Sequence, residues 1–321
     1  MELSIFLSNI DNILNLEETL RIIEKPNNPE LLKILDTNLR ANQDSLILLK
    51  DQMYKKNGAY YLDEIERIYY GNETCEFLIP SADNVKKALE FCRKNEYGFT
   101  LVTPYTTYKG IDNLKPLFEY LNGLEDIEVV VNDFGVLHLL NNNYPNLIPV
   151  LGRLLNKLKR DPRFSVSGYE IKNINIQNIK KVHKNQEEAL QTSSLENTLY
   201  QDMLKSKGIS RVGMDSIPQG YNNKVCKKWG FPIDLYWPWA YITSSRSCAV
   251  AAYTQPSKSF HPTDENCHRQ CKLLEMSFTS DKKMFKNVQR GNAIWMNSVK
   301  LLEEYLKIDI HRLIYQPYIP L

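Results

Sequence analysis

The sequence lacks the features of a membrane or exported protein. No run approaches the roughly 18 apolar residues of a membrane-spanning helix. The first residues, MELSIFLSNIDNILNLEETL, lack a basic segment and carry acidic residues within their apolar pattern, unlike a signal peptide. We therefore expect a cytoplasmic location and no membrane partner. Neither sign of charge is in excess, since 40 basic and 38 acidic residues give a net charge of +2. General attraction to nucleic acid is not predicted, although an RNA substrate stays open.

Several motifs that carry chemistry are also missing. No GxGxxG or Walker-type glycine loop follows any predicted strand, which argues against nucleotide binding. Because HExxH and GxSxG are absent, a zinc-binding hydrolase or peptidase is the last-ranked alternative. Six cysteines in 321 residues are too few for a disulfide scaffold. Clustered thiols in a reducing compartment therefore indicate metal ligands or redox groups.

The pattern of apolar residues predicts an α/β protein. In residues 1–62, Ile13, Leu16 and Leu20 recur at helical spacing, which predicts a helical N-terminal extension. Over residues 63–321, strands alternate with helices and end in polar turns, which favours a TIM-like (β/α)8 barrel with its chemistry at the carboxyl ends of the strands. The polar segment 168–194 is expected to be a loop or an insertion. The expected strands are 65–70, 98–103, 127–131, 147–151, 210–214, 232–243, 272–278, 292–296 and 310–314.

Three cysteines stand out in the polar segment that follows the aromatic run 236–241. Cys248, Cys267 and Cys271 lie within a span of 24 residues, and three residues separate the last two. Thiolates hold iron–sulfur clusters, and zinc accepts cysteine with histidine, here His261 or His268. From the spacing alone, a cluster and zinc are equally favoured. Cys75 is the preferred fourth ligand because it follows a predicted strand, Cys226 is the alternative, and Cys92 lies on an apolar helix face.

Three charged residues are candidates for substrate contacts. Asp133 follows the third predicted strand, and the same residue type in that place would also suit a helix cap. Arg153 follows the fourth strand, and Arg246 lies two residues before Cys248. Either guanidinium could bind a carboxylate in a bidentate manner, and either could instead form a structural ion pair. The expected partner is therefore a small organic substrate, which the arginines would suit if it is a carboxylate.

Four segments resemble a known family. They are IYYGNETC (68–75), EVVVNDFGVL (128–137), LGRLLNK (151–157) with Asp161-Pro162-Arg163, and SRSC (245–248) with the pair Cys267 and Cys271. Together they resemble the collagenase-like peptidase family (peptidase family U thirty-two), and within it the UbiV-like branch of oxygen-independent hydroxylation. The resemblance extends from about residue 64 to the C-terminus.

The resemblance implies a 4Fe–4S cluster on Cys75, Cys248, Cys267 and Cys271, at the catalytic end of a TIM-like barrel. It also implies hydroxylation-type or RNA-modification chemistry rather than peptide hydrolysis, and a related barrel subunit as a heterodimer partner. A noncatalytic, cluster-bearing partner of such a subunit is the alternative. The segments 1–62 and 168–194 have no counterpart in that branch, which leaves the substrate open.

Overall fold

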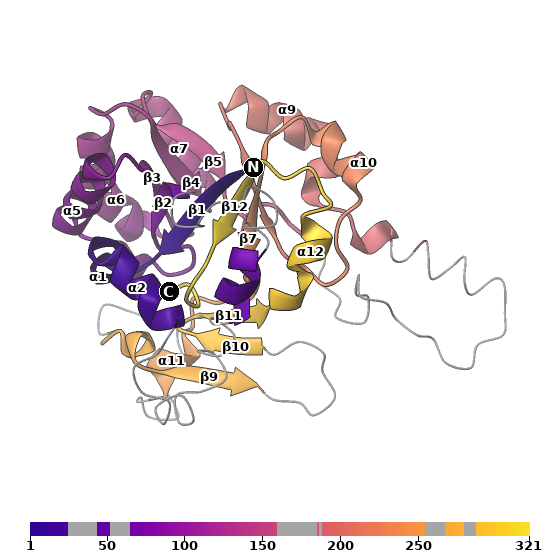
Figure 1. The fold of residues 1–321 in the computed structure, drawn as a ribbon. Helices are drawn as coiled ribbons and strands as arrows, with labels where there is room; N and C mark the ends of the chain where they lie inside the picture. The colour runs from indigo at the N-terminus through magenta and orange to yellow at the C-terminus, as the bar shows by residue number, and fades with distance from the viewer. Residues whose placement is uncertain (25–43, 52–64, 159–184, 186–187, 254–266, 279–286) are drawn as a thin grey trace.

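Eight parallel strands close into a barrel in the order β1–β12–β7–β6–β5–β4–β3–β2 (Figure 1). The structure is a computed structural model, and it describes residues 1–24, 44–51, 65–158, 185, 188–253, 267–278 and 287–321. The expected α/β TIM-like barrel is thus confirmed. The barrel strands are β1 (Glu2–Leu7), β2 (Ile65–Gly71), β3 (Gly98–Val102), β4 (Ile127–Val131), β5 (Ile148–Leu151), β6 (Val212–Asp215), β7 (Ile233–Trp237) and β12 (Arg312–Tyr315).

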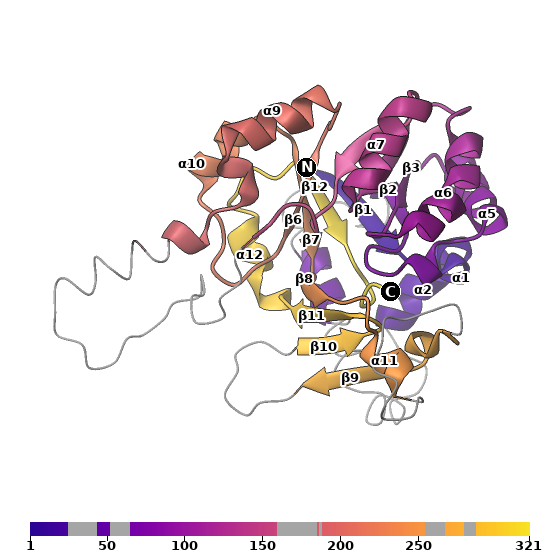
Figure 2. The ribbon, with the colours of Figure 1, turned by 180° about the vertical axis from the view of Figure 1, so that it is seen from behind.

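Helices cover the outside of the barrel (Figures 1 and 2). Helix α5 (Ala82–Lys94) begins where Ser81 Oγ accepts from the Asn84 N–H, and it buries Val85, Leu89 and Cys92. The other helices are α1 (Ile10–Leu14), α2 (Leu16–Glu24), α6 (Tyr108–Leu121), α7 (Phe134–Asn143), α9 (Thr198–Ser206), α10 (Asn223–Cys226), α11 (Ala249–Ala252), α12 (Leu302–Tyr305) and residues 44–51. Short 3-10 turns are η2 (Glu76–Leu78), η3 (Ser194–Glu196), η4 (Lys227–Trp229), η5 (Gln270–Lys272) and η6 (Val299–Leu301). None of the described helices combines the length and apolar character needed to cross a bilayer.

The N-terminus does not form a separate helical extension. Strand β1 pairs in parallel with both β12 and β2, so the first residues of the chain close the barrel. The boundary expected at residue 63 is therefore wrong for this segment. Leu3, Ile5, Phe6 and Leu7 are all buried, and a short apolar run buried on both faces has no alternation that would identify it as a strand. Helices α1 and α2 do follow it, as the spacing predicts, whereas 25–43 and 52–64 lie outside the described residues.

A second sheet is inserted between β7 and β12. The expected strand 232–243 divides at Trp237-Pro238: β7 stays in the barrel, and β8 (Trp239–Ser244) leaves it. Strand β8 joins β9 (Glu275–Phe278), β10 (Asn287–Arg290) and β11 (Ala293–Asn297) in an antiparallel sheet of order β8–β11–β10–β9. The strands expected near 272–278 and 292–296 therefore exist but do not belong to the barrel. This sheet lies across the carboxyl ends of the barrel strands, at the bottom of Figure 1.

The barrel interior has an apolar middle and two charged ends. Seven strands each contribute one buried side chain to the middle: Phe6, Tyr69, Val102, Val130, Val150, Tyr236 and Ile314. Near the amino ends of the strands, Arg312 pairs with Glu128 and Asp234. Near the carboxyl ends, Arg153 pairs with Glu73 and Asp215. The polar end that faces the second sheet lies next to the candidate site.

Candidate functional site

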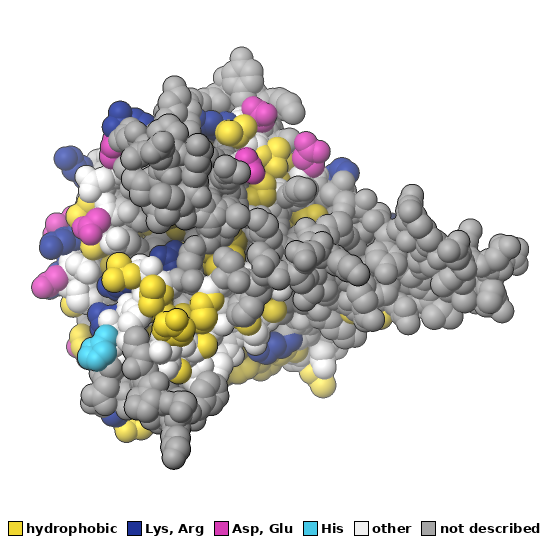
Figure 3. All heavy atoms as spheres, turned by 90° about the horizontal axis from the view of Figure 1, so that it is seen from below, with side chains coloured by type: hydrophobic (Ala, Val, Ile, Leu, Met, Phe, Trp, Pro, Cys, Tyr) yellow, Lys and Arg dark blue, Asp and Glu magenta, His cyan; other side chains and the backbone are white. Residues whose placement is uncertain are grey.

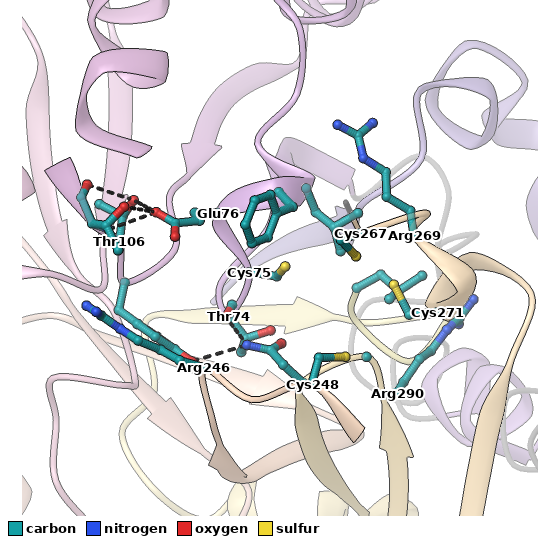
Figure 4. A pocket seen from close by; sticks show the side chains of 17 residues that line it. Thr74, Cys75, Glu76, Thr106, Arg246, Cys248, Cys267, Arg269, Cys271 and Arg290 are labelled. Atoms are coloured by element: carbon teal, nitrogen blue, oxygen red, sulfur yellow. Dashed lines mark hydrogen bonds between the residues drawn. The ribbon is translucent and has the colours of Figure 1, made fainter. Parts of the chain in front are cut away.

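The four cysteines selected from the sequence line one cavity of about 110 Å³. Cys75 lies on the loop after β2, whereas Cys248, Cys267 and Cys271 all belong to the segment between β8 and β9. The cavity therefore lies between the carboxyl end of the barrel and the inserted sheet. In Figure 4 the four sulfur atoms lie around the same space. None of the six cysteines forms a disulfide.

The loop after β2 is shaped to present Cys75. Gly71 has a φ of 138°, and a Cβ there would lie 2.1 Å from the Val102 carbonyl oxygen, so only glycine fits. The Asn72 side chain then accepts from the N–H groups of Thr74 (2.9 Å) and Cys75 (2.6 Å), which closes a tight turn. Cys75 follows directly, with its side chain in the cavity.

Asn292, on the turn between β10 and β11, connects the two halves of the site. Its amide donates to the carbonyl oxygen of Thr74, beside Cys75, and to that of Ser245 (3.0 Å), three residues before Cys248. The Ser245 N–H in turn donates to the Asn292 carbonyl oxygen (3.0 Å). One side chain thus holds the barrel loop and the inserted segment at a fixed separation.

The remaining cysteines lie on two short turns. Cys248 caps α11, and its sulfur accepts from the Ala251 N–H at 3.4 Å. Between Cys267 and Cys271 the chain reverses at Arg269, whose φ of 56° is left-handed. Gly291, in the β10–β11 turn beside Cys271, has a left-handed φ of 61°, which glycine adopts without strain.

Burial favours the protonated form of three of the cavity thiols, those of Cys75, Cys248 and Cys271. Burial raises the pKa of Cys75 to about 12 and the pKa of Cys271 to about 11, and the neighbouring cysteines add to both shifts. Burial also raises the pKa of Cys248. A metal that binds here must therefore displace protons from the sulfur atoms.

Three arginines line the same cavity: Arg246, Arg269 and Arg290. Arg246 thus lies where the sequence placed it, beside the cysteines. The positive charge of Arg290 acts to lower the pKa of Cys271. An anionic group in the cavity would be stabilised by these guanidinium groups.

Arg153 does not lie in the cavity, and the structure corrects its candidate role. It is fully buried and donates to Glu73 Oε2 (2.6 Å) and Asp215 Oδ1 (2.8 Å). Its guanidinium lies 4.3 Å from the Tyr236 ring centre and 4.8 Å from that of Trp295. Two protein carboxylates already occupy this arginine, so it fits a structural ion pair and not a substrate clamp.

Asp133 is a helix cap. Its Oδ1 accepts from the N–H groups of Gly135 (2.6 Å) and Val136 (3.4 Å) at the start of α7, and its Oδ2 accepts from the Thr106 N–H (3.4 Å). It does not line the cysteine cavity. The proposed substrate contact of Asp133 is therefore wrong, and the alternative role as a helix cap is the one that the structure shows.

The other cysteines and histidines lie elsewhere. Cys92 and Cys226 are buried in the main hydrophobic core outside the cavity. His268 is exposed and does not line the cavity, and His261 lies outside the described residues. Of the candidate fourth ligands, only Cys75 reaches the other three cysteines.

Glu76 is a site residue that sequence reasoning missed. Its Oε2 accepts from Thr106 Oγ1 (2.9 Å), the Thr107 N–H (2.8 Å) and Thr107 Oγ1 (2.7 Å), as the dashed lines in Figure 4 show. Burial raises its pKa, but these donors and the charge of Arg246 outweigh burial, so the pKa of Glu76 lies below its ordinary value. Its position directly after Cys75 was the available signal.

Comparisons with known proteins add no relative. No family model, no curated protein and no solved structure matches the chain. Among the described side chains, no group of three or more His, Cys, Asp or Glu residues is arranged to hold a metal ion. The four thiols line a cavity without converging on a single point. One water molecule needs a cavity volume of about 10–15 Å³. The volume of about 110 Å³ between the thiols can therefore hold a group much larger than one water molecule.

Proposed function

We propose that the chain is an iron–sulfur protein that holds a 4Fe–4S cluster on Cys75, Cys248, Cys267 and Cys271. The observation that carries the proposal is that these thiols, up to 196 positions apart in the sequence, line one cavity at the carboxyl end of the barrel. Four cysteine thiolates are the usual ligand set of such clusters. The resemblance of four sequence segments to the collagenase-like peptidase family supports the same assignment.

The surroundings of the thiols favour a cluster over zinc. A tetrahedral zinc ion needs its ligands about 2.0–2.3 Å from one point, and no such convergent group occurs among the described side chains. Four thiolates with a cluster carry net negative charge, which Arg290, whose charge already acts on Cys271, would offset in part. The N–H of Ala251, which faces Cys248 Sγ, is the kind of sulfur hydrogen bond that tunes cluster potential.

The reaction class follows from the resemblance and the position of the site. We propose an enzyme, or an enzyme subunit, for oxygen-independent hydroxylation or a related modification of a small organic substrate. A bound cluster would supply electron transfer. The chain's own residues would orient the substrate at the barrel mouth, where the guanidinium groups of Arg246 and Arg269 would attract a carboxylate and Glu76 offers a fixed, ionised carboxylate.

A cluster-bearing partner of a related subunit is the second candidate, and one surface feature favours it. Leu273, two residues after Cys271, is 90% exposed, and Leu274 is 44% exposed. On the face seen in Figure 3, hydrophobic side chains gather in one area, with Lys and Arg side chains beside them. A heterodimer would cover such a surface beside the cysteines. Co-purification of a second barrel protein, with activity only in the complex, would support this role.

Metal analysis of anaerobically purified protein tests the proposal. We expect iron and acid-labile sulfide in equal amounts. The protein should be brown, with a broad absorbance at about 400 nm that is typical of thiolate-bound clusters. A colourless protein with stoichiometric zinc and no iron would contradict the cluster assignment. The same thiols would then be assigned as zinc ligands.

A further inference from the structure

The two carboxylate oxygens of Glu76 differ in their hydrogen bonds: Oε2 accepts three from described residues, and Oε1 accepts none. In Figure 4 the second oxygen carries none of the dashed lines. Arg246 lies near enough to lower the pKa of Glu76 but forms no ion pair with it among the described residues. The arrangement leaves one oxygen of a fixed carboxylate without a described donor, on a residue that lines the cavity.

A glycine in α6, Gly110, leaves the space that this carboxylate occupies. Gly110 lies in the first turn of α6, and a Cβ there would lie 1.6 Å from Thr106 Oγ1 and 2.6 Å from Glu76 Oε2. Glycine in a helix costs about 1 kcal/mol relative to alanine. Any larger residue would displace Glu76 or Thr106. The position of Glu76 is therefore set by its donors and by the space that Gly110 leaves.

A larger cavity, of about 1080 Å³, adjoins the cysteine cavity at this residue. The two cavities share Glu76, Phe77, Thr107 and Arg269. Arg269 forms no side-chain hydrogen bond or ion pair with the described residues, and in Figure 4 its guanidinium points away from the sulfur atoms. Tyr108 and Leu117 add apolar surface to the larger cavity. Apolar walls with a few fixed polar groups are typical of small-molecule sites.

We propose that the larger cavity binds a small aromatic hydroxy acid. Its hydroxyl donates to Oε1 of Glu76, its carboxylate pairs with Arg269, and its ring lies against Phe77 and Tyr108. A hydroxyl suits Glu76 better than an ammonium group does, because Arg246, Arg269 and Arg290 make the adjoining cavity positive. The inference rests on the proposed function in one respect: it takes the ligand beside the cysteines to be the substrate.

Calorimetric titration with three related probes tests this site. The probes are 4-hydroxyphenylacetate, phenylacetate, which lacks the hydroxyl, and 4-hydroxyphenylacetamide, which lacks the charge. On the anaerobically purified full chain we expect 4-hydroxyphenylacetate to bind about tenfold more tightly than either of the others, the effect of one hydrogen bond to a charged group. Equal affinity for 4-hydroxyphenylacetate and phenylacetate, or no binding of any probe, overturns the proposal.

Two variants assign the groups. In Glu76→Gln the amide oxygen can replace Oε2 against its three donors, and an NH₂ group replaces Oε1, so the preference for the hydroxyl should fall to about threefold or less. Asp112→Asn is the control, because Asp112 lines the same cavity but pairs with Lys115 at 2.8 Å. An unchanged hydroxyl preference in Glu76→Gln would overturn the role of Glu76.

The same design separates the carboxylate contact from the cluster. Arg269→Gln should weaken both acids about tenfold and leave the amide unchanged, whereas Lys272→Gln, an exposed cation outside this cavity, should change neither. Equal loss in both variants would overturn the role of Arg269. Iron is measured on the same samples. Binding without iron contradicts the cluster alone, and iron without binding contradicts the hydroxy-acid site alone.

Discussion

Arg153 and Glu73 form an ion pair, with Nη2 and Oε2 2.6 Å apart and both side chains fully buried. Glu73 follows β2 and lies two residues before Cys75, while Arg153 follows β5 and also donates to the Trp239 carbonyl oxygen at the start of the inserted sheet. The pair therefore joins the barrel to the segment that carries the other three cysteines. Removing one charge leaves the other buried without a partner, which is costly.

Arg153→Met should accordingly lower the free energy of unfolding by about 3–5 kcal/mol. Urea unfolding at neutral pH measures this, with Arg93→Met, an exposed residue, as the control. Adding Glu73→Gln to Arg153→Met removes one unpaired carboxylate and should restore part of the loss. A single variant as stable as the wild type would contradict the account of this pair.

Asn292 should control how firmly the site holds its contents. Asn292→Ala removes the donor that joins Thr74 to Ser245, so the Cys75 loop and the Cys248 segment lose their fixed separation. We expect unfolding free energy to fall by only about 1–3 kcal/mol, the cost of unsatisfied acceptors, while iron is lost to a chelator much faster than from the wild type. Asn287→Ala, on β10 of the same sheet, is the control. Equal iron loss in both variants would refute the positioning role.

The opposite end of the barrel predicts a pH dependence. Burial raises the pKa of Glu128, but the hydrogen bond and charge of Arg312, at 2.7 Å, and the charge of Arg67 outweigh it and hold the pKa below its ordinary value. A carboxylate whose folded pKa is lowered adds stability above its unfolded pKa of about 4.3, and that stability is lost as the pH falls through the folded pKa.

Glu128→Gln should therefore lower the free energy of unfolding by about 3 kcal/mol at pH 7. This is the lower end of the range for a broken buried ion pair, because Arg312 still pairs with Asp234 and Glu2. The difference between variant and wild type should shrink in urea titrations taken from about pH 5 to about pH 3. Glu125→Gln, an exposed neighbour, should show no such change. A pH-independent difference would contradict the assignment.

Replacing Gly110 by alanine should destabilise the protein, although glycine-to-alanine changes inside helices usually stabilise. Glycine to alanine inside a helix ordinarily stabilises by about 1 kcal/mol. Because the new Cβ would meet Thr106 and Glu76, Gly110→Ala should instead lower the unfolding free energy by about 1–3 kcal/mol. In Gly123→Ala the nearest atom is the Tyr120 carbonyl oxygen at 3.7 Å, and the change should stay within about 0.5 kcal/mol. Thermal unfolding of both variants decides the point, and a stabilised Gly110→Ala would show that Glu76 is not held as described.

The parts of the fold that the sequence predicted are those with strong local signals. Strand β4 follows from a β-branched run that only Glu128 interrupts, and α5 follows from Ser81 and an apolar face that includes Val85 and Cys92. The paired position of β1 could not be predicted, because its partners β12 and β2 lie far away in the sequence. The inserted sheet was likewise assigned to the barrel, since short strands carry no sign of which sheet they join.

The site divides in the same way. The four cysteines were identifiable because thiols are rare and clustered, and the turn after β2 indicated Cys75. The partners of Arg153 were not, since Glu73 and Asp215 are 80 and 62 positions away and only the closed barrel brings them together. Glu76 carried no motif, and its role depends on donors from the loop before α6.

Iron content across the six single Cys→Ser variants tests the central claim most directly. The wild type should hold about four iron atoms per chain after anaerobic purification. The variants at Cys75, Cys248, Cys267 and Cys271 should lose most of this iron, and those at Cys92 and Cys226, buried outside the cavity, should retain it. Iron that survives in Cys75→Ser but disappears in Cys226→Ser, or no iron in the wild type, would contradict the account.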